Sequence, residues 1–103
     1  MIVRVLTATL KAERAGLFNE LMRVQLPIRR EDPGLRYAKL SRRILGSEQE
    51  VLLFEEWIDT ASLYAWAGPD LDRPRLLPGA EDLVLDLRVA HYEALDMDPD
   101  PDG

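Results

Sequence analysis

The chain contains no cysteine and a single histidine in 103 residues. The absence of cysteine excludes thiolate nucleophiles, disulfides and cysteine-ligated metals. One imidazole leaves little for a zinc or iron centre, because such sites usually draw on two or more imidazole or thiolate ligands. We therefore expect chemistry that needs no bound metal.

Long apolar runs are also missing from the sequence. None approaches the roughly 18 residues that a membrane-spanning helix needs, and the first residues lack the charged start and long apolar middle of a signal peptide. Basic residues form no one-sided surface, because the pairs Arg29-Arg30 and Arg42-Arg43 have acids nearby. We expect a cytoplasmic protein without a membrane or nucleic-acid partner.

The formal net charge of -6 is concentrated at the C-terminal end. Four of the negative charges belong to Asp96, Asp98, Asp100 and Asp102, which alternate with Met and Pro. Prolines cannot join a strand ladder and like charges repel, so we expect residues 96–103 to form a solvated, disordered tail. An acidic interaction tail is the functional alternative. Residues 1–95 have the length and composition of one globular domain.

The first half of the domain reads as a strand, a helix and a second strand. Residues 2–10 are rich in Val, Leu, Ile and Thr, which predicts a strand covered on both faces. Residues 12–30 have helical periodicity, although no strong capping residue precedes them and Pro27 interrupts the last turns. Residues 35–45 form the next predicted strand. The buried stripe predicted for the helix consists of Leu17, Phe18, Leu21, Met22, Val24 and Ile28.

The second half repeats this order with a shorter helix. Residues 46–49 form a polar hairpin loop, and residues 51–58 return as the partner strand. Asp59 is placed to cap a helix at residues 60–67, and the proline-containing stretch 70–80 predicts a loop or an irregular short helix. A last strand is predicted at residues 83–90. Its aliphatic face consists of Leu83, Leu85, Leu87 and Val89, with His91 on the same side.

The predicted order of strand, helix, strand, strand, helix, strand indicates an α+β fold. Two such halves form a ferredoxin-like, four-stranded antiparallel sheet with both helices on one face. The other face offers apolar residues from the first and third strands, and bare apolar surface of this kind marks an interface. A two-fold homodimer, sheet against sheet, covers it most simply.

Two short motifs carry a resemblance to a known family. The chain from residue 1 to about residue 95, with Asp32-Pro33-Gly34 after the helix and Glu56-Trp57 at the end of the hairpin, resembles the antibiotic biosynthesis monooxygenases. These are small proteins that form dimeric α+β barrels. The resemblance implies a cofactor-independent oxygenase that oxidises a small aromatic or polycyclic phenol or quinol with molecular oxygen. The alternative is a non-catalytic homodimer of the same fold that is structural or binds a small molecule.

Some members of this family degrade heme, and this chain matches their site residues only in part. Trp66 matches the tryptophan that this branch places in the short helix, nine residues after the strand tryptophan. Its strand asparagine and iron-ligating histidine, however, correspond to Thr7 and Leu76. Heme is therefore a disfavoured cofactor, unless His91 ligates iron from a different element.

Five residues are candidates for the site. His91 has the unperturbed pKa closest to neutrality and could serve as a base for a phenolic proton, although a hydrogen-bonded structural histidine is the commoner case. Trp66 could stack on a flat substrate or simply pack. Tyr37, Tyr64 and Asn19 could hydrogen-bond a quinol oxygen, with interface or solvent positions as their alternatives.

Other residues of the predicted strands are assigned to structure instead. Trp57 is predicted to be a core or interface aromatic. Glu55 and Glu56 cannot act together as acid and base, because adjacent strand residues point to opposite faces. Arg42, Arg43 and Arg88 are expected to pair with Glu55, Glu56 or Asp86.

Overall fold

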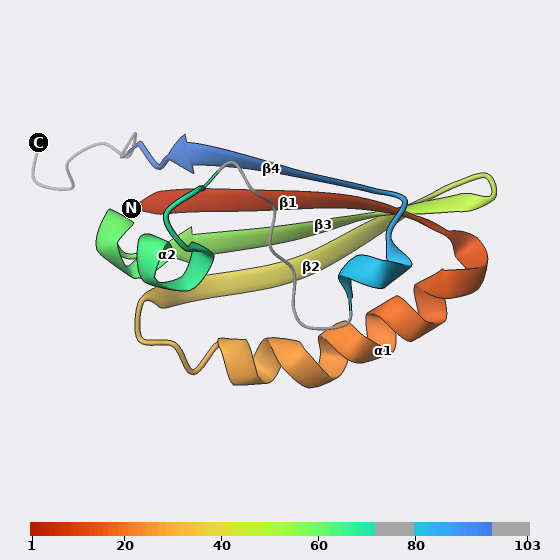
Figure 1. Cartoon of the computed structure of the whole chain (residues 1–103), viewed down its shortest axis with the longest axis horizontal. Coiled ribbons are helices and arrows are strands. Elements are labelled where there is room, and N and C mark those ends of the chain that lie inside the picture. The colour runs from red at the N-terminus through yellow and green to blue at the C-terminus, as the bar shows by residue number, and fades with distance from the viewer. Residues whose placement is uncertain (72–79, 96–103) are drawn as a thin grey trace, which may run out of the picture.

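The computed structural model describes residues 1–71 and 80–95. Two strands flank the long helix and two more follow, with a short helix between them (Figure 1). The predicted tail and most of the predicted 70–80 loop lie outside the described residues. The elements are β1 (Ile2–Lys11), α1 (Ala12–Arg29), β2 (Leu35–Leu45), β3 (Glu48–Trp57), α2 (Thr60–Ala67), a 3-10 helix (Glu81–Leu83) and β4 (Asp86–Glu93).

The sheet is antiparallel, with the strand order β2-β3-β1-β4. Both helices cover the same face, α1 along its length and α2 near one end (Figure 1). The predicted ferredoxin-like α+β architecture is therefore confirmed. No helix in residues 1–71 and 80–95 is long and apolar enough to cross a membrane.

Buried and less buried residues alternate along the two central strands, β1 and β3. This alternation separates the core face of the sheet from its open face. Every second residue of β1 from Arg4 to Leu10 is buried, and so is every second residue of β3 from Gln49 to Trp57. The residues between them are mostly only half-buried. This period of two places one series from each strand under the helices and the other on the opposite face.

The buried side of α1 differs from the predicted stripe. Phe18 and Met22 are buried as expected, but Leu17, Val24 and Ile28 are about 60% exposed, at 61%, 58% and 59%. The stripe that faces the sheet is rotated and consists of Ala15, Phe18, Met22, Leu26 and Arg29. A helix with apolar residues on several sides does not identify its buried side by periodicity alone. In α1, the charged residue Arg29 completes the buried stripe.

Two boundaries also differ from the sequence prediction. Strand β3 begins at Glu48 instead of Val51, because residues 46 and 47 alone make the turn and Gly46 takes a positive φ of 61°. Strand β4 begins at Asp86, after a 3-10 helix that buries Leu83. Leu85 is 54% exposed, so the aliphatic face of β4 begins only at Leu87.

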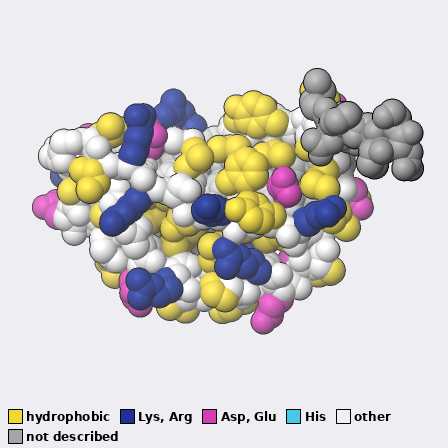
Figure 2. All heavy atoms as spheres, turned by 180° about the vertical axis from the view of Figure 1, so that it is seen from behind, with side chains coloured by type: hydrophobic (Ala, Val, Ile, Leu, Met, Phe, Trp, Pro, Cys, Tyr) yellow, Lys and Arg dark blue, Asp and Glu magenta, His cyan; other side chains and the backbone are white. Residues whose placement is uncertain are grey.

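The face without helices presents an apolar patch. Figure 2 shows hydrophobic side chains gathered near its centre, with lysines and arginines around them. We call the set Val5, Tyr37, Leu52, Phe54 and Tyr92 the open-face patch. Tyr37 and Phe54 pack edge to face, with ring centroids 6.2 Å apart. Tyr92 is 58% exposed.

Candidate active site

A row of polar side chains crosses the helix-covered face of the sheet. Strand register places Glu55 of β3 opposite Arg4 of β1, and Arg4 opposite His91 of β4. The side chains of Arg4 and Glu55 are 0% exposed, whereas His91 is half-buried. Register between three strands thus assembles ionisable groups that are far apart in the sequence.

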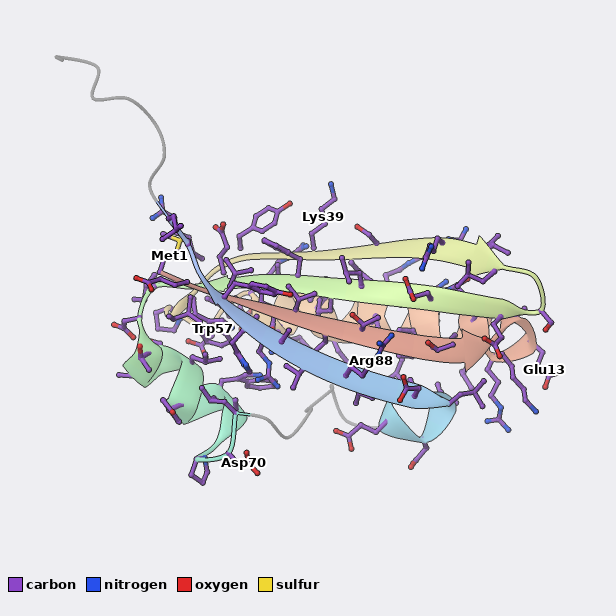
Figure 3. All side chains as sticks on the ribbon, turned by 90° about the horizontal axis from the view of Figure 1, so that it is seen from above. Met1, Glu13, Lys39, Trp57, Asp70 and Arg88 are labelled. Atoms are coloured by element: carbon purple, nitrogen blue, oxygen red, sulfur yellow. The ribbon has the colours of Figure 1, made fainter. Side chains whose placement is uncertain are left out.

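Apolar residues enclose this row on both sides. Toward one end of the sheet lie Ile2 and Trp57, which is 0% exposed. Toward the other lie Leu6 and Leu53, opposite each other in the register. Figure 3 shows Trp57 on the helix side of the sheet and Lys39 pointing from β2 to the other side. Arg4 and Glu55 are therefore shielded from water, whereas His91 on β4 is only partly shielded.

Arg29 reaches the row from the last turn of α1. Its guanidinium forms an ion pair with Oε2 of Glu55, while Nε of Arg4 lies 3.6 Å from Oε1 of the same carboxyl group. Buried ions of this kind need each other, because each alone loses several kcal/mol of hydration. Glu55 is the common partner of two arginines that come from different elements.

Burial and charge act on Glu55 in opposite directions. Removal from water raises the pKa of its carboxyl group, and this effect outweighs Arg29, Arg4 and the indole of Trp57, which all favour the charged form. The carboxyl group therefore titrates above the ordinary value of 4.5. The site is a coupled set of charges and not a simple ion pair.

Trp66 brings the second helix to the same place. The guanidinium carbon of Arg29 lies 3.8 Å from the centroid of the Trp66 ring, a cation–π contact. We refer to Arg4, Arg29, Glu55, Trp66 and His91 as the polar cluster. An indole face and two guanidinium groups beside an imidazole can bind an aromatic ring and an anionic oxygen.

The position of α2 follows from two local features of the sequence. The Asp59 carboxylate accepts a hydrogen bond of 2.8 Å from the amide of Ser62, and thus caps the helix as predicted. Gly34 packs directly against α2, because a Cβ built on it would lie 2.4 Å from Cβ of Ser62. Its carbonyl accepts from the amide of Ile58 at 3.0 Å. The Asp-Pro-Gly motif therefore sets how closely α2 can approach.

His91 is hydrogen-bonded within the polar cluster. Its Nε2 lies 2.9 Å from Nη1 of Arg4. The strand prediction placed His91 on the side of the aliphatic core, and its register opposite Arg4 confirms this side.

The other predicted site residues lie apart from this cluster. Tyr37 is on the opposite face of the sheet. Tyr64 is on α2 but 43% exposed. Asn19 lines a hollow of about 420 Å³ between α1 and β2, together with Arg23 and Arg30. The structure therefore links His91 to Trp66 through Arg4, Glu55 and Arg29, and it places the remaining three candidates elsewhere.

The sequence analysis missed the residues that link His91 to Trp66. Arg4, Arg29 and Glu55 received no site role, and Glu55 was expected to pair with Arg42, Arg43 or Arg88. Arg43 pairs with Glu50 instead, whereas Arg88 pairs with Asp86, one of its expected partners. A signal was present, because Arg4 and Glu55 each share strand parity with buried apolar neighbours, and opposite charges on two buried faces can pair.

Only one of the two residues that correspond to the asparagine and histidine of the heme-degrading branch lies among the described residues. Thr7 is half-buried on β1 and alternates with Leu6 and Ala8, so it points away from the helices. Leu76 lies outside the described residues. Within residues 1–71 and 80–95, no group of three or more His, Cys, Asp or Glu side chains could hold a metal ion.

Comparisons with known proteins agree with this architecture. The family model for antibiotic biosynthesis monooxygenase matches residues 1–70. No curated protein matches the sequence. A protein from Deinococcus radiodurans assigned to these monooxygenases is 21% identical, with a TM-score of 0.73 over 96% of this chain and 97% of its own.

Two further solved structures share the fold. A protein from Nitrosomonas europaea with the same assignment is 15% identical, with a TM-score of 0.72 over 93% of this chain and 100% of its own. The heme-degrader MhuD from Mycobacterium tuberculosis is 18% identical, with a TM-score of 0.67 over 95% of this chain and 100% of its own. At these identities the structures establish the fold alone. Since the family model spans well over half of the sequence, the chain belongs to the antibiotic biosynthesis monooxygenase family.

Proposed function

We propose that the protein oxidises a small aromatic or polycyclic phenol or quinol with molecular oxygen and without a cofactor. One observation carries the proposal: the polar cluster joins His91, Arg4, Arg29 and Trp66 on the helix side of the sheet. An imidazole can accept a phenolic proton, and guanidinium groups can stabilise the phenolate that forms. An indole offers a flat surface for the ring.

In this mechanism His91 takes the proton of the bound phenol, and the electron pair stays on the substrate. The resulting anion is electron-rich enough to reduce oxygen directly. With an anthrone as substrate, one oxygen atom becomes the new carbonyl group and the other leaves as water. The protein binds and orients the ring, holds the proton and excludes bulk water.

The charges of the cluster favour an anionic form of the substrate. Among the described residues it contains two guanidinium groups, from Arg4 and Arg29, and one carboxyl group, from Glu55. Nearby positive charge lowers the pKa of a phenol, because it stabilises the charged form. The guanidinium groups therefore stabilise the phenolate that proton transfer to His91 leaves behind.

Heme fits the described residues poorly. Nε2 of His91 accepts the hydrogen bond from Arg4, so an iron ion would have to displace Arg4 from that nitrogen. Thr7, which stands where the heme-degrading branch has asparagine, points away from Trp66.

A non-catalytic homodimer of the same fold is the second candidate. It is favoured by the burial of Arg4, Arg29 and Glu55, which have the partners and the enclosure of a structural ion cluster. Such clusters can specify one packing arrangement without any reaction. In that case Trp66 only packs against Arg29.

Self-association is part of the proposal in both cases. The open-face patch exposes aromatic and aliphatic side chains on one face of the sheet (Figure 2). If two copies pack through this face about a two-fold axis, the patch is buried. The two sheets then form the inner layers of the dimer and the helices lie on the outside.

An oxygen electrode tests the reaction. The purified protein is mixed with a panel of anthrones and quinols, with and without added hemin, and quinone formation is followed by absorbance. The proposal expects oxygen uptake matched by quinone formation with at least one substrate class, independent of hemin. Binding of these compounds without uptake would favour the non-catalytic dimer, and uptake only with hemin would favour a heme protein.

A further inference from the structure

We infer that Arg4 is a positioning residue for His91: it fixes the imidazole as the neutral tautomer with its proton on Nδ1, so that Nε2 is the atom that accepts the substrate proton. This inference rests on the proposed function, in which His91 is the base. It assigns a role to a buried arginine that also forms an ion pair with Glu55.

The hydrogen-bond chemistry of arginine determines the tautomer. A guanidinium group carries donors only and stays protonated in proteins. In the 2.9 Å contact between Nη1 of Arg4 and Nε2 of His91, the imidazole nitrogen must therefore accept. A neutral imidazole with an accepting Nε2 carries its proton on Nδ1. An imidazolium has no acceptor and could not make this bond.

Arg4 is itself held in place by its other neighbours. It lies between Glu55 and His91 in the strand register, and its side chain is 0% exposed. Glu55, which attracts Nε of Arg4, is held in turn by Arg29 of α1. Enclosed side chains with charged partners have little rotational freedom, so the direction of Nη1 toward His91 is maintained by the fold.

The bond also defines an exchange of partners during proton transfer. A phenol that reaches Nε2 displaces the N–H of Arg4 from the single lone pair of that nitrogen and then transfers its proton there, which converts His91 to imidazolium and leaves the electron pair on the phenolate oxygen. Nε2 then carries a hydrogen and no longer accepts from Arg4. The N–H of Arg4 is free to donate to the new phenolate at that moment, so the bond to the base is replaced by a bond to the anion. Protons and charge balance without an oxidant in this step.

Nuclear magnetic resonance of the imidazole ring tests the inference directly. His91 is the single histidine of the chain, so its two ring nitrogens can be assigned without ambiguity. Long-range proton–nitrogen correlations distinguish a protonated from an accepting ring nitrogen. In the substrate-free protein near neutral pH, we expect Nδ1 to be protonated and Nε2 to be the acceptor.

Two variants separate the effect of Arg4 from a general effect of charge. Arg4→Met removes the donor and should release the tautomer, so that a population with the proton on Nε2 appears. Arg88→Met, on the same strand as His91 but 67% exposed and paired with Asp86, should leave the ring signals unchanged. If Arg4→Met does not fold, the wild-type tautomer still decides, because a proton on Nε2 excludes the Arg4 bond.

The inference would be overturned by a proton on Nε2 in the wild type, or by an unchanged Nδ1 proton in a folded Arg4→Met variant. Neither result depends on turnover. Absence of oxygen uptake with an Nδ1 proton present would contradict the proposed function alone. Oxygen uptake with a proton on Nε2 would contradict the role of Arg4 alone.

Discussion

The guanidinium group of Arg29 stacks on the ring of Trp66, 3.8 Å from its centroid, while it forms an ion pair with Glu55. One side chain of α1 therefore contacts both the central sheet and α2. This links the stability of the protein to the geometry of the candidate site.

Replacement of Arg29 by methionine should destabilise the protein strongly at neutral pH. We expect a loss of about 3–5 kcal/mol in the free energy of unfolding, because Glu55 would keep its buried charge with one cation fewer. The loss should shrink in acid, where the carboxyl group can take up a proton. Urea denaturation of both proteins at neutral and acidic pH measures it.

Arg43→Met is the matched control, since Arg43 forms an ion pair with Glu50 in which its own side chain is 66% exposed. Exposed pairs contribute little, so this variant should remain close to the wild type. Equal losses for the two variants would contradict a special role for burial at Arg29.

The two ion-paired glutamates of β3 should give opposite pH dependences. Burial raises the pKa of Glu55 in the folded state, so its contribution to stability is fully present below its ordinary pKa and is lost as pH rises through the folded value. The hydrogen bond from Arg43 lowers the pKa of Glu50, so its contribution is present above the ordinary pKa and is lost as pH falls.

Denaturation of Glu55→Gln and Glu50→Gln from about pH 4 to about pH 8 tests this contrast. The stability of the wild type relative to Glu55→Gln should decrease with rising pH. Relative to Glu50→Gln it should increase. The same sign of slope for both would show that Arg4 and Arg29 outweigh the burial of Glu55.

Removal of the Asp59 cap should loosen α2 and thereby Trp66. Its carboxylate accepts from the amide of Ser62, which lowers the pKa of Asp59. The capping contribution is therefore present above the ordinary pKa and is lost as pH falls through the folded value. Asp59→Ala should speed amide exchange in α2 at neutral pH, whereas Asp59→Asn should preserve most of the protection. Unchanged exchange in Asp59→Ala would show that packing alone holds α2.

A charge in the open-face patch should separate the proposed dimer. Leu52→Lys places an ammonium group in the open-face patch, whereas Leu17→Lys places one on the exposed side of α1. Light scattering should give about twice 11.7 kDa for the wild type and Leu17→Lys, and a smaller mass for Leu52→Lys. A wild-type mass of 11.7 kDa at micromolar concentration would contradict self-association.

Local signals predicted most of the fold, because several elements begin or end at a recognisable feature. Asp59 caps α2, and the Asp-Pro-Gly segment ends the region of α1. The buried side predicted for α1 was wrong, because Leu17 and Val24 belong to its apolar pattern but are not covered by the sheet. Which side a helix buries depends on what it packs against, and Arg29 packs there because Glu55 is its partner.

The site was less predictable than the fold. His91 and Trp66 could be selected from the sequence, one for its titration range and one for its place in the short helix. Their connection through Arg4 and Arg29 depends on the register of β1 with β3 and β4, which local pattern does not specify. Buried charges on strand positions are the signal that would improve such a prediction.

Oxygen uptake by the wild type and by His91→Gln, measured on chelator-treated protein with anthrone and quinol substrates, tests the central claim most directly. The proposed mechanism predicts oxygen consumption equimolar with the anthrone oxidised by the wild type. It predicts background rates for a His91→Gln protein that keeps its fold and still binds the substrate. Equal uptake by the two proteins would contradict the role of His91 as base, and background rates for both across the whole panel would contradict the proposed oxidation.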